Sequence, residues 1–333
     1  MAVEFGDEAL AHLTTAIRAA LPAWGLPPEA DVALLNVSEN ATFRVDDARG
    51  GRAVALRVHR LNYHAAEEIR SEIAWIEALR REAIVETPAP LPGRDGDYLQ
   101  ILVSPSGLPP RHAVAFAFAP GAEPAPDADL PGWFKILGTL TARMHRHTER
   151  WTPPERFRRK TWDFDAMFGP RPLWGDWRAG VGLDAAGRAL LGRALDLIGA
   201  RLDRFGRTPE RFGLIHADLR LANLLVDGAH LRVIDFDDCG FCWRLYDFAA
   251  AVSFFEHEPI VEALRDAWIE GYRTVRALPQ EEADEMPVFI AMRRFLLVAW
   301  IASHPEVPVA RELGAAYTLG AMDMAERLLS DFG

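Results

Sequence analysis

The first third of the chain combines two helical patterns with several runs that have the period of β-strands. Residues 7–20 carry acids in the first turn of a helical pattern, and a second helix is predicted from about Ala65 to Glu82. The turn chemistry at Asp46–Gly51 favours a hairpin. Strands are predicted at 31–40, 41–47, 52–60, 97–104 and 112–119, with a turn at 104–110 between the last two. A helix inserted into an antiparallel sheet predicts an α+β lobe at residues 1–118.

The rest of the chain is mainly helical in pattern. Residues 119–131 hold the densest Pro, Gly and Ala stretch and are predicted to be a linker before a helical lobe at 132–333. The exception is LLVDGAHLRVIDF (224–236), which predicts two short strands around an Asp-Gly turn. Helices are predicted at 132–148, 184–204, 245–256, 260–277, 285–302 and 308–331.

Composition narrows the class of protein. The chain has 333 residues, half of them apolar and about a quarter charged, as in soluble globular proteins. Its net charge of −11 argues against a nucleic-acid partner, because nucleic-acid-binding proteins usually have an excess of basic residues. No apolar run approaches the ~18 residues that span a bilayer, and the acidic N-terminus lacks a signal-peptide pattern. We therefore expect a cytoplasmic protein with no membrane partner.

The two cysteines, Cys239 and Cys242, stand in the order CGFC. This spacing occurs in redox sites and in half of a zinc site, but a zinc site needs further ligands and no second cysteine pair exists. A redox pair normally opens a helix, whereas this pair follows a predicted strand. We favour two buried structural cysteines over redox chemistry.

Polar residues interrupt two apolar runs in LIHADLRLANLLV, residues 214–226. The spacing His-x-Asp-Leu-x-x-x-Asn in HADLRLAN (216–223) is that of a kinase catalytic loop with Ala217 in place of Arg. Phosphoryl transfer needs a group that orients the acceptor hydroxyl and oxygen ligands for magnesium. Asp218 can orient the hydroxyl, and Asn223 and Asp235 can hold the metal if the predicted hairpin brings them side by side. The alternative is a structural turn.

With RLYDFA after VIDFDD, these motifs resemble the aminoglycoside phosphotransferase and choline kinase superfamily, which has a two-lobe, protein-kinase-like fold. The family includes antibiotic, choline and homoserine kinases and a bacterial stress-response Ser/Thr kinase. The resemblance implies ATP and Mg²⁺ as cofactors, Asp218 as the catalytic Asp, and Asn223 and Asp235 as metal ligands. It also implies that Asp247 is buried and braces the catalytic loop through backbone hydrogen bonds.

Two departures from protein kinases change the expectations. Asp-Phe-Asp replaces Asp-Phe-Gly, so Asp237 is either an extra metal ligand or a solvated acid, and Asp238 is expected to face solvent. Ala217 removes the Arg that senses a phosphorylated activation loop in many protein kinases, so regulation by that route is not expected.

The N-terminal lobe offers a cation and a carboxylate for nucleotide binding. Strand alternation places Arg57 on one face with Ala55 and His59, at the position where the family usually has Lys. In the predicted helix 65–82 the apolar stripe has Glu72 at its centre, and a carboxylate on an inward face needs a partner. We expect an ion pair between Arg57 and Glu72 that binds ATP phosphates. The alternatives are that Arg57 lies on the surface of an edge strand and that the Glu72 side chain extends beyond the apolar residues into solvent.

The phosphate-covering loop is expected at NVSENATFRV (36–45), although it has no GxGxxG. Ser38, Asn40 and Thr42 can supply its contacts. The adenine is expected against FAFAPG (116–121), where Phe116 or Phe118 either faces the base or fills the sheet's core.

The acceptor site is expected in the helical lobe, facing Asp218. Residues 151–178, with four tryptophans and the basic residues Arg156, Arg158, Arg159 and Lys160, form either a lid or an irregular connection anchored by its Trp side chains. Arg220 can neutralise developing charge or bind an anionic acceptor, and Trp243 and Arg244 are further candidates.

Three functions follow from these observations. The first is an ATP-dependent kinase of a small hydroxyl compound, such as an amino alcohol, an amino acid or an aminoglycoside. The second is a protein Ser/Thr kinase, which the short segment CGFCWRLYD after VIDFDD disfavours. The third is a nucleotide-binding pseudokinase, which Arg57 in place of Lys favours and the presence of Asp218, Asn223 and Asp235 disfavours.

Overall fold

The computed structural model describes residues 5–104, 107, 109–125 and 129–333, and it divides into two compact units. The first unit ends at Pro120 and also includes Pro153–Arg158, and the second contains Gly121–Thr152 and Arg159–Gly333. The predicted turn at 104–110 and linker at 119–131 lie partly outside the described residues. The functional domain bounds given above stay a prediction.

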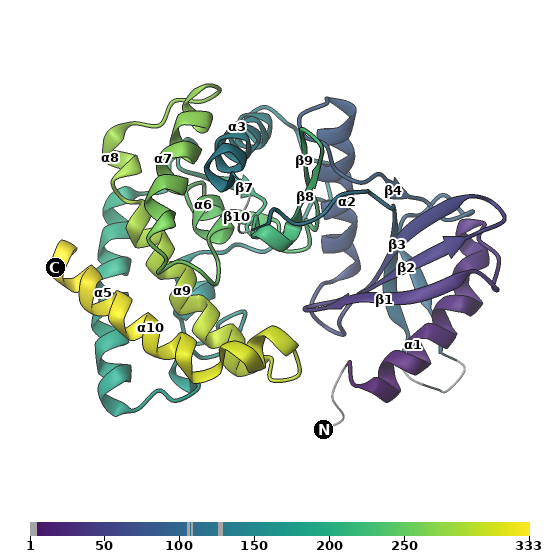
Figure 1. Cartoon of the computed structure of the whole chain (residues 1–333), viewed down its shortest axis with the longest axis horizontal. Helices are drawn as coiled ribbons and strands as arrows, with labels where there is room; N and C mark the ends of the chain where they lie inside the picture. Colours follow the sequence, from purple (N-terminus) through teal and green to yellow (C-terminus); the bar gives the residue numbers. More distant parts are fainter. Residues whose placement is uncertain (1–4, 105–106, 108, 126–128) are drawn as a thin grey trace. The chain divides into compact units, whose positions relative to one another are not determined.

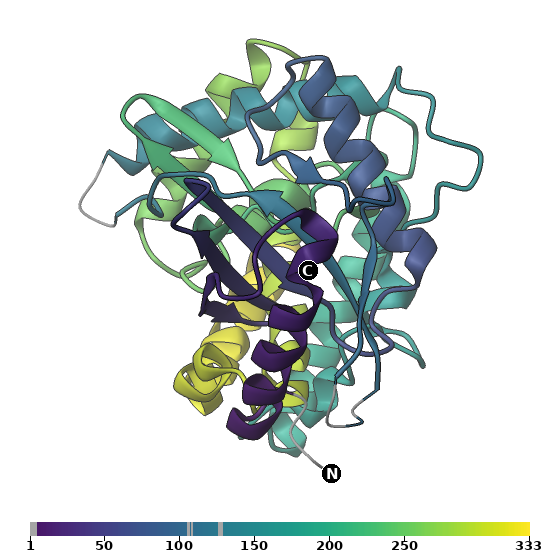
Figure 2. The same cartoon turned by 90° about the vertical axis from the view of Figure 1, so that its right-hand side faces the viewer.

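The first unit is an antiparallel sheet with one helix on each face (Figures 1 and 2). Its strands run in the order β1-β2-β3-β6-β4, and β5 also pairs with β6. Each predicted strand is present, β2 with its predicted bounds and the others in shorter form, and β4 was not predicted. The strands are β1 Asp31–Val37, β2 Ala41–Asp47, β3 Arg52–Val58, β4 Pro90–Leu91, β5 Gln100–Leu102 and β6 Arg111–Ala117.

Strand alternation separates the two faces of this sheet. Val54, Leu56 and Val58 of β3 pack in a core with helix α1 (Asp7–Ala20), which a short 3-10 helix follows at Leu21–Trp24. The other face, which includes Arg57, is covered by α2 (Ala66–Arg81), whose apolar stripe is buried as predicted. Successive strand residues point to opposite faces, so a charged residue between apolar ones is directed toward α2.

The second unit is helical except for two small, two-stranded antiparallel sheets. Strand β7 (Phe212–Ile215) pairs with β10 (Gly240–Trp243), and β8 (Leu224–Asp227) pairs with β9 (His230–Val233). Its helices are α3 Leu130–Thr148, α4 Phe164–Phe168, α5 Ala185–Phe205, α6 Tyr246–Ala251, α7 Ile260–Arg273, α8 Gln280–Ala283, α9 Met286–Ser303 and α10 Pro308–Phe332, with 3-10 turns at Trp177–Ala179 and Leu221–Asn223.

Three predictions for this unit need correction. The helix predicted at 245–256 ends at Ala251, since Phe254 adopts a φ of 78° that a continuing helix does not allow. The helix predicted at 308–331 bends at Gly314, where φ is 43°. Residues 240–243, predicted only to follow a strand, form β10 themselves, because β7 offers a free edge there.

Helix α9 is the most apolar helix of the second unit. Among the described residues, one segment, 280–303, is long and apolar enough to cross a membrane, but 83% of its most apolar window is buried within the protein. Its residues from Val288 to Ile301 are all buried, including Arg293 and Arg294. These properties are those of a core helix.

Helices α3 and α7 approach each other closely through glycines. A Cβ atom at Gly138 of α3 would overlap the backbone oxygen of Trp268, and one at Gly271 of α7 would overlap that of Lys135. The close approach lets side chains of α3 and α7 bond directly, as His145 and Tyr272 do.

We expect Gly138→Ala to lower the free energy of unfolding by about 1–3 kcal/mol, because the added methyl group meets backbone that cannot move aside. The matched variant is Gly192→Ala in α5, where the nearest atom lies 4.0 Å from the added Cβ. That change should be neutral or stabilising by up to about 1 kcal/mol, because Ala is the better helix former. Urea unfolding of both variants tests this, and equal effects would contradict it.

Candidate active site

The loop His216–Asn223 connects β7 to β8. Its backbone turns sharply at Ala217, where φ is 68°, and the chain bends again at Asp235, where φ is 60°. The β8–β9 hairpin continues into the loop, because the Ile234 N–H donates to the Asn223 carbonyl at 2.9 Å. The backbone of Asn223 is thereby paired with Ile234, the residue before Asp235.

Asp218 is surrounded by donors on both carboxylate oxygens. Its Oδ1 accepts from Arg293 at 2.6 Å, and its Oδ2 accepts from Asn223 Nδ2 at 2.8 Å and from Arg220 Nε at 3.2 Å. Burial by itself raises the pKa of this carboxyl group, but the charges of Arg293 and Arg220 outweigh burial and hold the pKa below its ordinary value. Asp218 is therefore a fixed anion in a mostly buried place.

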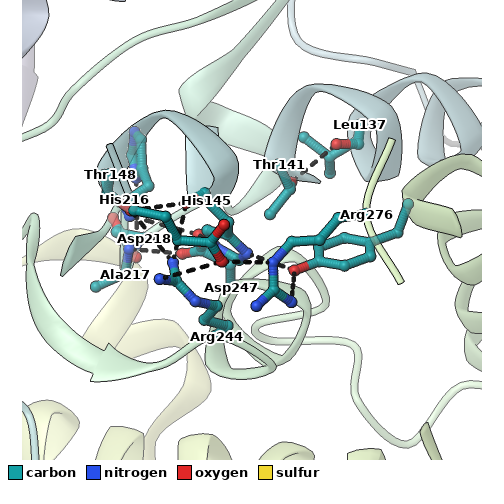
Figure 3. Close-up of polar contacts among 12 residues, drawn as sticks. Leu137, Thr141, His145, Thr148, His216, Ala217, Asp218, Arg244, Asp247 and Arg276 are labelled. Carbon is teal, nitrogen blue, oxygen red and sulfur yellow. Dashed lines mark hydrogen bonds and ion pairs between the residues drawn. The ribbon is translucent and has the colours of Figure 1, made fainter. Parts of the chain in front are cut away.

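Asp247 braces the loop in the way the family resemblance implies (Figure 3). Its Oδ1 accepts from the Ala217 N–H at 2.7 Å, and its Oδ2 accepts from the His216 N–H at 3.4 Å. Burial raises the pKa of Asp247 to about 7, although both backbone donors lower it. This brace satisfies two buried N–H groups at the point where the Ala217 backbone is strained.

His145 of α3 links this brace to α7. Its Nε2 lies 2.9 Å from Asp247 Oδ2, and its Nδ1 lies 2.9 Å from the Tyr272 hydroxyl group. Burial lowers the pKa of His145 well below its ordinary value, so the ring is neutral. Neutral His145 donates from Nε2 to Asp247 and accepts the Tyr272 hydroxyl proton at Nδ1, an assignment that satisfies every group in the chain of bonds.

The residues expected to hold a metal provide hard oxygen donors. Both Nδ2 bonds of Asn223 go to Asp218, one to the carboxylate and one to the backbone carbonyl at 2.8 Å, so Oδ1 is turned away from Asp218. An amide oxygen and a carboxylate, the groups that Asn223 and Asp235 carry, are donors that Mg²⁺ prefers. Asp237 is buried, and its backbone carbonyl accepts from Arg159. The expectation of a solvated Asp238 is wrong, since it is 7% exposed.

The predicted Arg57–Glu72 ion pair is present in the first unit. Arg57 Nη2 donates to Glu72 Oε2 at 2.6 Å, and both side chains are buried. Glu72 Oε1 is also buried and has no hydrogen-bond partner among the described residues. Arg57 lies on the strand face shared with Thr42 and Phe116, with its guanidinium group 5.4 Å from the Phe116 ring centroid.

The loop after β1 is tied to β3 by its own polar groups. The backbone N–H of Arg60 donates to Asn40 Oδ1 at 3.1 Å, and its side chain reaches the Ser38 and Glu39 carbonyls. The side chain of Asn40 is therefore occupied within the unit, while Ser38 is half-buried. Phe118 does not fill the core, because it is half-buried with the Arg44 guanidinium group 4.3 Å from its ring centroid.

Several residues that were candidates for binding the acceptor are instead buried in the protein, where they stabilise the fold. Trp243 and Arg244 are buried and bonded to the backbone carbonyls of Gly206 and Pro209. In the segment 151–178, Arg159 is buried, and the tryptophans at 162, 174 and 177 are buried anchors. This arrangement agrees with the anchored connection. Cys239 and Cys242 are both buried, and burial raises the pKa of Cys242 well above its ordinary value.

Sequence reasoning missed Arg293 and His145. Arg293 is 2% exposed and contacts Asp218 directly, and His145 is fully buried against Asp247. A signal for Arg293 was available: two arginines interrupt the apolar run of α9, and a buried charge requires a partner. For His145 no such signal exists, because its partners are about a hundred residues away in the chain.

Comparison with known proteins defines a kinase, a phosphotransferase with a protein-kinase-like α+β fold. A model of the phosphotransferase enzyme family matches residues 32–282, and the chain belongs to that family. The predicted family and fold class are thus confirmed.

The chain is also similar to solved structures and to a curated protein of unassigned function. A structure of a microcompartment-associated aminopropanol kinase is 43% identical, with 96% of this chain and 98% of that chain covered and a TM-score of 0.88. The amicoumacin kinase hAmiN, solved with AMP-PNP, Ca²⁺ and Ami, is 20% identical over 96% of each chain, with a TM-score of 0.77, and shares the fold. An uncharacterized protein of Deinococcus radiodurans is 28% identical over 280 residues, which are 81% of this chain and 76% of that protein.

His216 predicts a pH dependence of stability. Its Nδ1 accepts from the Asp218 N–H, its Nε2 donates to the Ile234 carbonyl, and burial lowers its pKa to about 4. Between pH 6.5 and 4 the unfolded chain therefore binds a proton that the folded chain does not. The stabilising contribution is complete above pH 6.5 and is lost as the pH falls toward 4.

Between pH 7 and pH 5, wild type should lose about 2 kcal/mol more unfolding free energy than His216→Asn. Urea unfolding at the two pH values measures this difference. His230→Asn, at an exposed histidine, is the control and should keep the wild-type dependence. If the two variants behave alike, His216 is not the group responsible.

Proposed function

We propose that this kinase transfers the γ-phosphate of ATP to the hydroxyl group of a small amino alcohol of the aminopropanol type. The observation that carries the proposal is the Asp218 carboxylate, bonded to Asn223 on a loop that Asp247 braces and that pairs through Asn223 with Ile234, the residue before Asp235. The 43% identity with an aminopropanol kinase over almost the full length of both chains supports the acceptor class.

In the proposed reaction, Asp218 orients the acceptor hydroxyl. The acceptor oxygen bonds to the γ-phosphorus, the bond from that phosphorus to the bridging oxygen breaks, and ADP leaves. The hydroxyl proton passes to Asp218 and then to solvent. A buried, pre-oriented carboxylate needs no reorganisation at the moment of transfer, which is where such sites gain most of their rate.

Asn223 and Asp235 are proposed to hold Mg²⁺, with Asp237 as a further ligand. When bound, the metal neutralises charge on the phosphate oxygens. The fit rests on the donor set, because the Nδ2 group of Asn223 is committed to Asp218 and its amide oxygen is turned away. Arg220, the most exposed donor to Asp218, is proposed to meet the negative charge of the transferring phosphoryl group.

In the first unit, Arg57 is proposed to bind ATP phosphates and Glu72 to hold Arg57 in place. Arg binds phosphate as a planar fork, and the bond from Nη2 to Glu72 fixes the orientation of that fork. Ser38 and Asn40 are proposed to shape the phosphate-covering loop, and Phe118 to contact the adenine. Asn40 acts through the backbone of its loop, since its side chain already accepts from Arg60.

The alternative functions are less well supported. Residues between Asp238 and Tyr246 form β10, paired with β7, and do not form an open activation segment of the kind that a regulated protein kinase uses. A pseudokinase would not need the Arg57–Glu72 pair together with the ordered Asp218 site. A cytoplasmic location without nucleic-acid or membrane partners is part of the proposal.

The decisive experiment measures ATP consumption with a panel of acceptors: aminopropanol, ethanolamine, choline, homoserine, an aminoglycoside, a sugar and a generic protein substrate. We expect turnover with amino alcohols. Asp218→Asn should lower kcat by at least about 1,000-fold while Mg–ATP binding persists, because only the hydroxyl-orienting charge is removed. Asp227→Asn, at an exposed hairpin turn, is the matched control. Full turnover of Asp218→Asn would show that the base is wrongly assigned.

Removing the partner of Arg57 tests the nucleotide half of the proposal. Glu72→Ala should raise the KM for ATP about tenfold or more, because Arg57 is then no longer held in the phosphate-binding position. Glu67→Ala, on the exposed side of the same helix, should leave ATP kinetics unchanged. Initial rates at varied ATP measure both, and an unaltered KM and kcat in Glu72→Ala would rule out the role of the ion pair.

A further inference from the structure

Arg293 is held more rigidly than any other group that contacts Asp218. It lies in the fully buried stretch of α9, and its side chain is 2% exposed. Nε donates to Ser253 Oγ at 3.0 Å, Nη1 to the Tyr246 hydroxyl at 3.1 Å and Nη2 to Asp218 Oδ1 at 2.6 Å. The Trp174 ring centroid lies 5.2 Å from the guanidinium carbon. Every nitrogen of the guanidinium group is thus occupied, and it has no room to reorient.

Arg220 is held in the opposite manner. Its side chain is 20% exposed, and its Nε bond of 3.2 Å to Asp218 Oδ2 is its one polar contact with any residue that the structure describes. Both terminal nitrogens are therefore uncommitted within the described chain. A single long bond to a partly exposed side chain contributes little stability and is easily exchanged.

The two carboxylate oxygens of Asp218 differ in how firmly their partners are held, because Arg293 bonds to Oδ1 and Arg220 to Oδ2. A carboxylate oxygen has two lone-pair positions, and those of Oδ2 are occupied by Asn223 at 2.8 Å and Arg220 at 3.2 Å. Asn223 is bonded a second time, to the Asp218 backbone carbonyl, so it does not leave readily. An acceptor hydroxyl that donates to Oδ2 must take the position of Arg220.

We propose that Arg293 is a positioning residue that anchors Asp218 through Oδ1 and so presents Oδ2 to the acceptor, and that the incoming hydroxyl displaces Arg220 from Oδ2. This inference rests on the proposed function, because it assumes an acceptor hydroxyl at Asp218. Displacement frees the guanidinium group of Arg220 at the moment when the transferring phosphoryl group develops charge. The resting ion pair between Arg220 and Asp218 therefore occupies Oδ2 until an acceptor is bound.

The neighbouring residue Arg294 provides a matched control for Arg293. It lies in the same buried helix, is also 2% exposed, and pairs with Glu256 at 3.0 Å and the Tyr317 carbonyl at 3.1 Å. It has no contact with Asp218. Arg293→Gln and Arg294→Gln each leave one buried carboxylate without its arginine, so their effects on folding should be similar.

We expect Arg293→Gln to lower kcat about 100-fold with the KM for ATP unchanged, because a displaced carboxylate no longer meets the acceptor correctly. Arg293→Lys should restore part of kcat, since it returns a charge without the planar fork. Arg294→Gln should keep kcat within about threefold of wild type. If Arg293→Gln and Arg294→Gln lose kcat equally, Arg293 is only a structural residue.

Tyr246→Phe and Ser253→Ala keep the charge of Arg293 and remove one bond from it. They give the same test if Arg293→Gln does not fold. Each should lower kcat about three- to tenfold without a change in the KM for ATP. When either is combined with Asp218→Asn, the further loss should disappear, because the positioned group is gone. A full additional loss in the double variant would overturn the positioning role.

Arg220→Gln tests the displacement. Without the competing ion pair the acceptor meets an open Oδ2, so the KM for the acceptor should fall at least about threefold, while kcat also falls because the phosphoryl charge loses its partner. A higher acceptor KM would mean that Arg220 binds the acceptor directly, and it would overturn this half of the proposal.

Failure of the proposed function has a different signature. If wild type phosphorylates no acceptor in the panel, the proposed function is wrong, and crystal structures then decide the role of Arg293. In Arg293→Gln the Asp218 side chain should leave its position, whereas in Arg294→Gln it should remain in place. An unmoved Asp218 in both structures would overturn the positioning role.

Discussion

The carboxylate of Asp247 is the interaction on which the rest of the site depends. A loop that presents Asp218 and Asn223 cannot pair its own N–H groups in a strand, because its backbone turns through a left-handed conformation at Ala217. Buried N–H groups without partners would destabilise the loop by roughly 1–3 kcal/mol each. Asp247 accepts two of them and is itself held by His145. The positions of α3, α7 and the catalytic loop are thereby tied to one buried group.

Buried arginine–carboxylate pairs recur in both units, and their energetics point to function more than to stability. Arg57–Glu72 and Arg293–Asp218 each bury two charges, and an apolar pair of the same volume is often at least as stable. Such a pair has an advantage where a charge must be held in one orientation. In each unit the pair holds a group to which we assign a part in phosphoryl transfer: Arg57 as the proposed phosphate-binding cation in the first and Asp218 as the proposed hydroxyl-orienting carboxylate in the second.

Local patterns were sufficient for much of the fold and for part of the site. The stripe of α2 predicted an inward carboxylate at Glu72, and the strand period of β3 predicted the face that carries Arg57, so their pairing followed. The hairpin β8–β9 predicted that Asn223 would lie beside Asp235. Predictions were wrong where a distant segment decided the outcome: Asp238 is buried by chain packed around it, and residues 240–243 became a strand because β7 lies alongside.

The sequence by itself determined the class of the protein, most of its elements and the pairing of Arg57 with Glu72, because these depend on periodicity and on spacing within about twenty residues. Only the tertiary structure decided how Asp218 is held. Arg293 is 75 residues away from it and His145 is 102 residues away from Asp247. A contact across such a separation leaves no periodic trace in the chain, because the pattern around one residue does not say which distant residue will meet it. Folding alone brings the partners together, and the need to satisfy buried charge determines which of them meet.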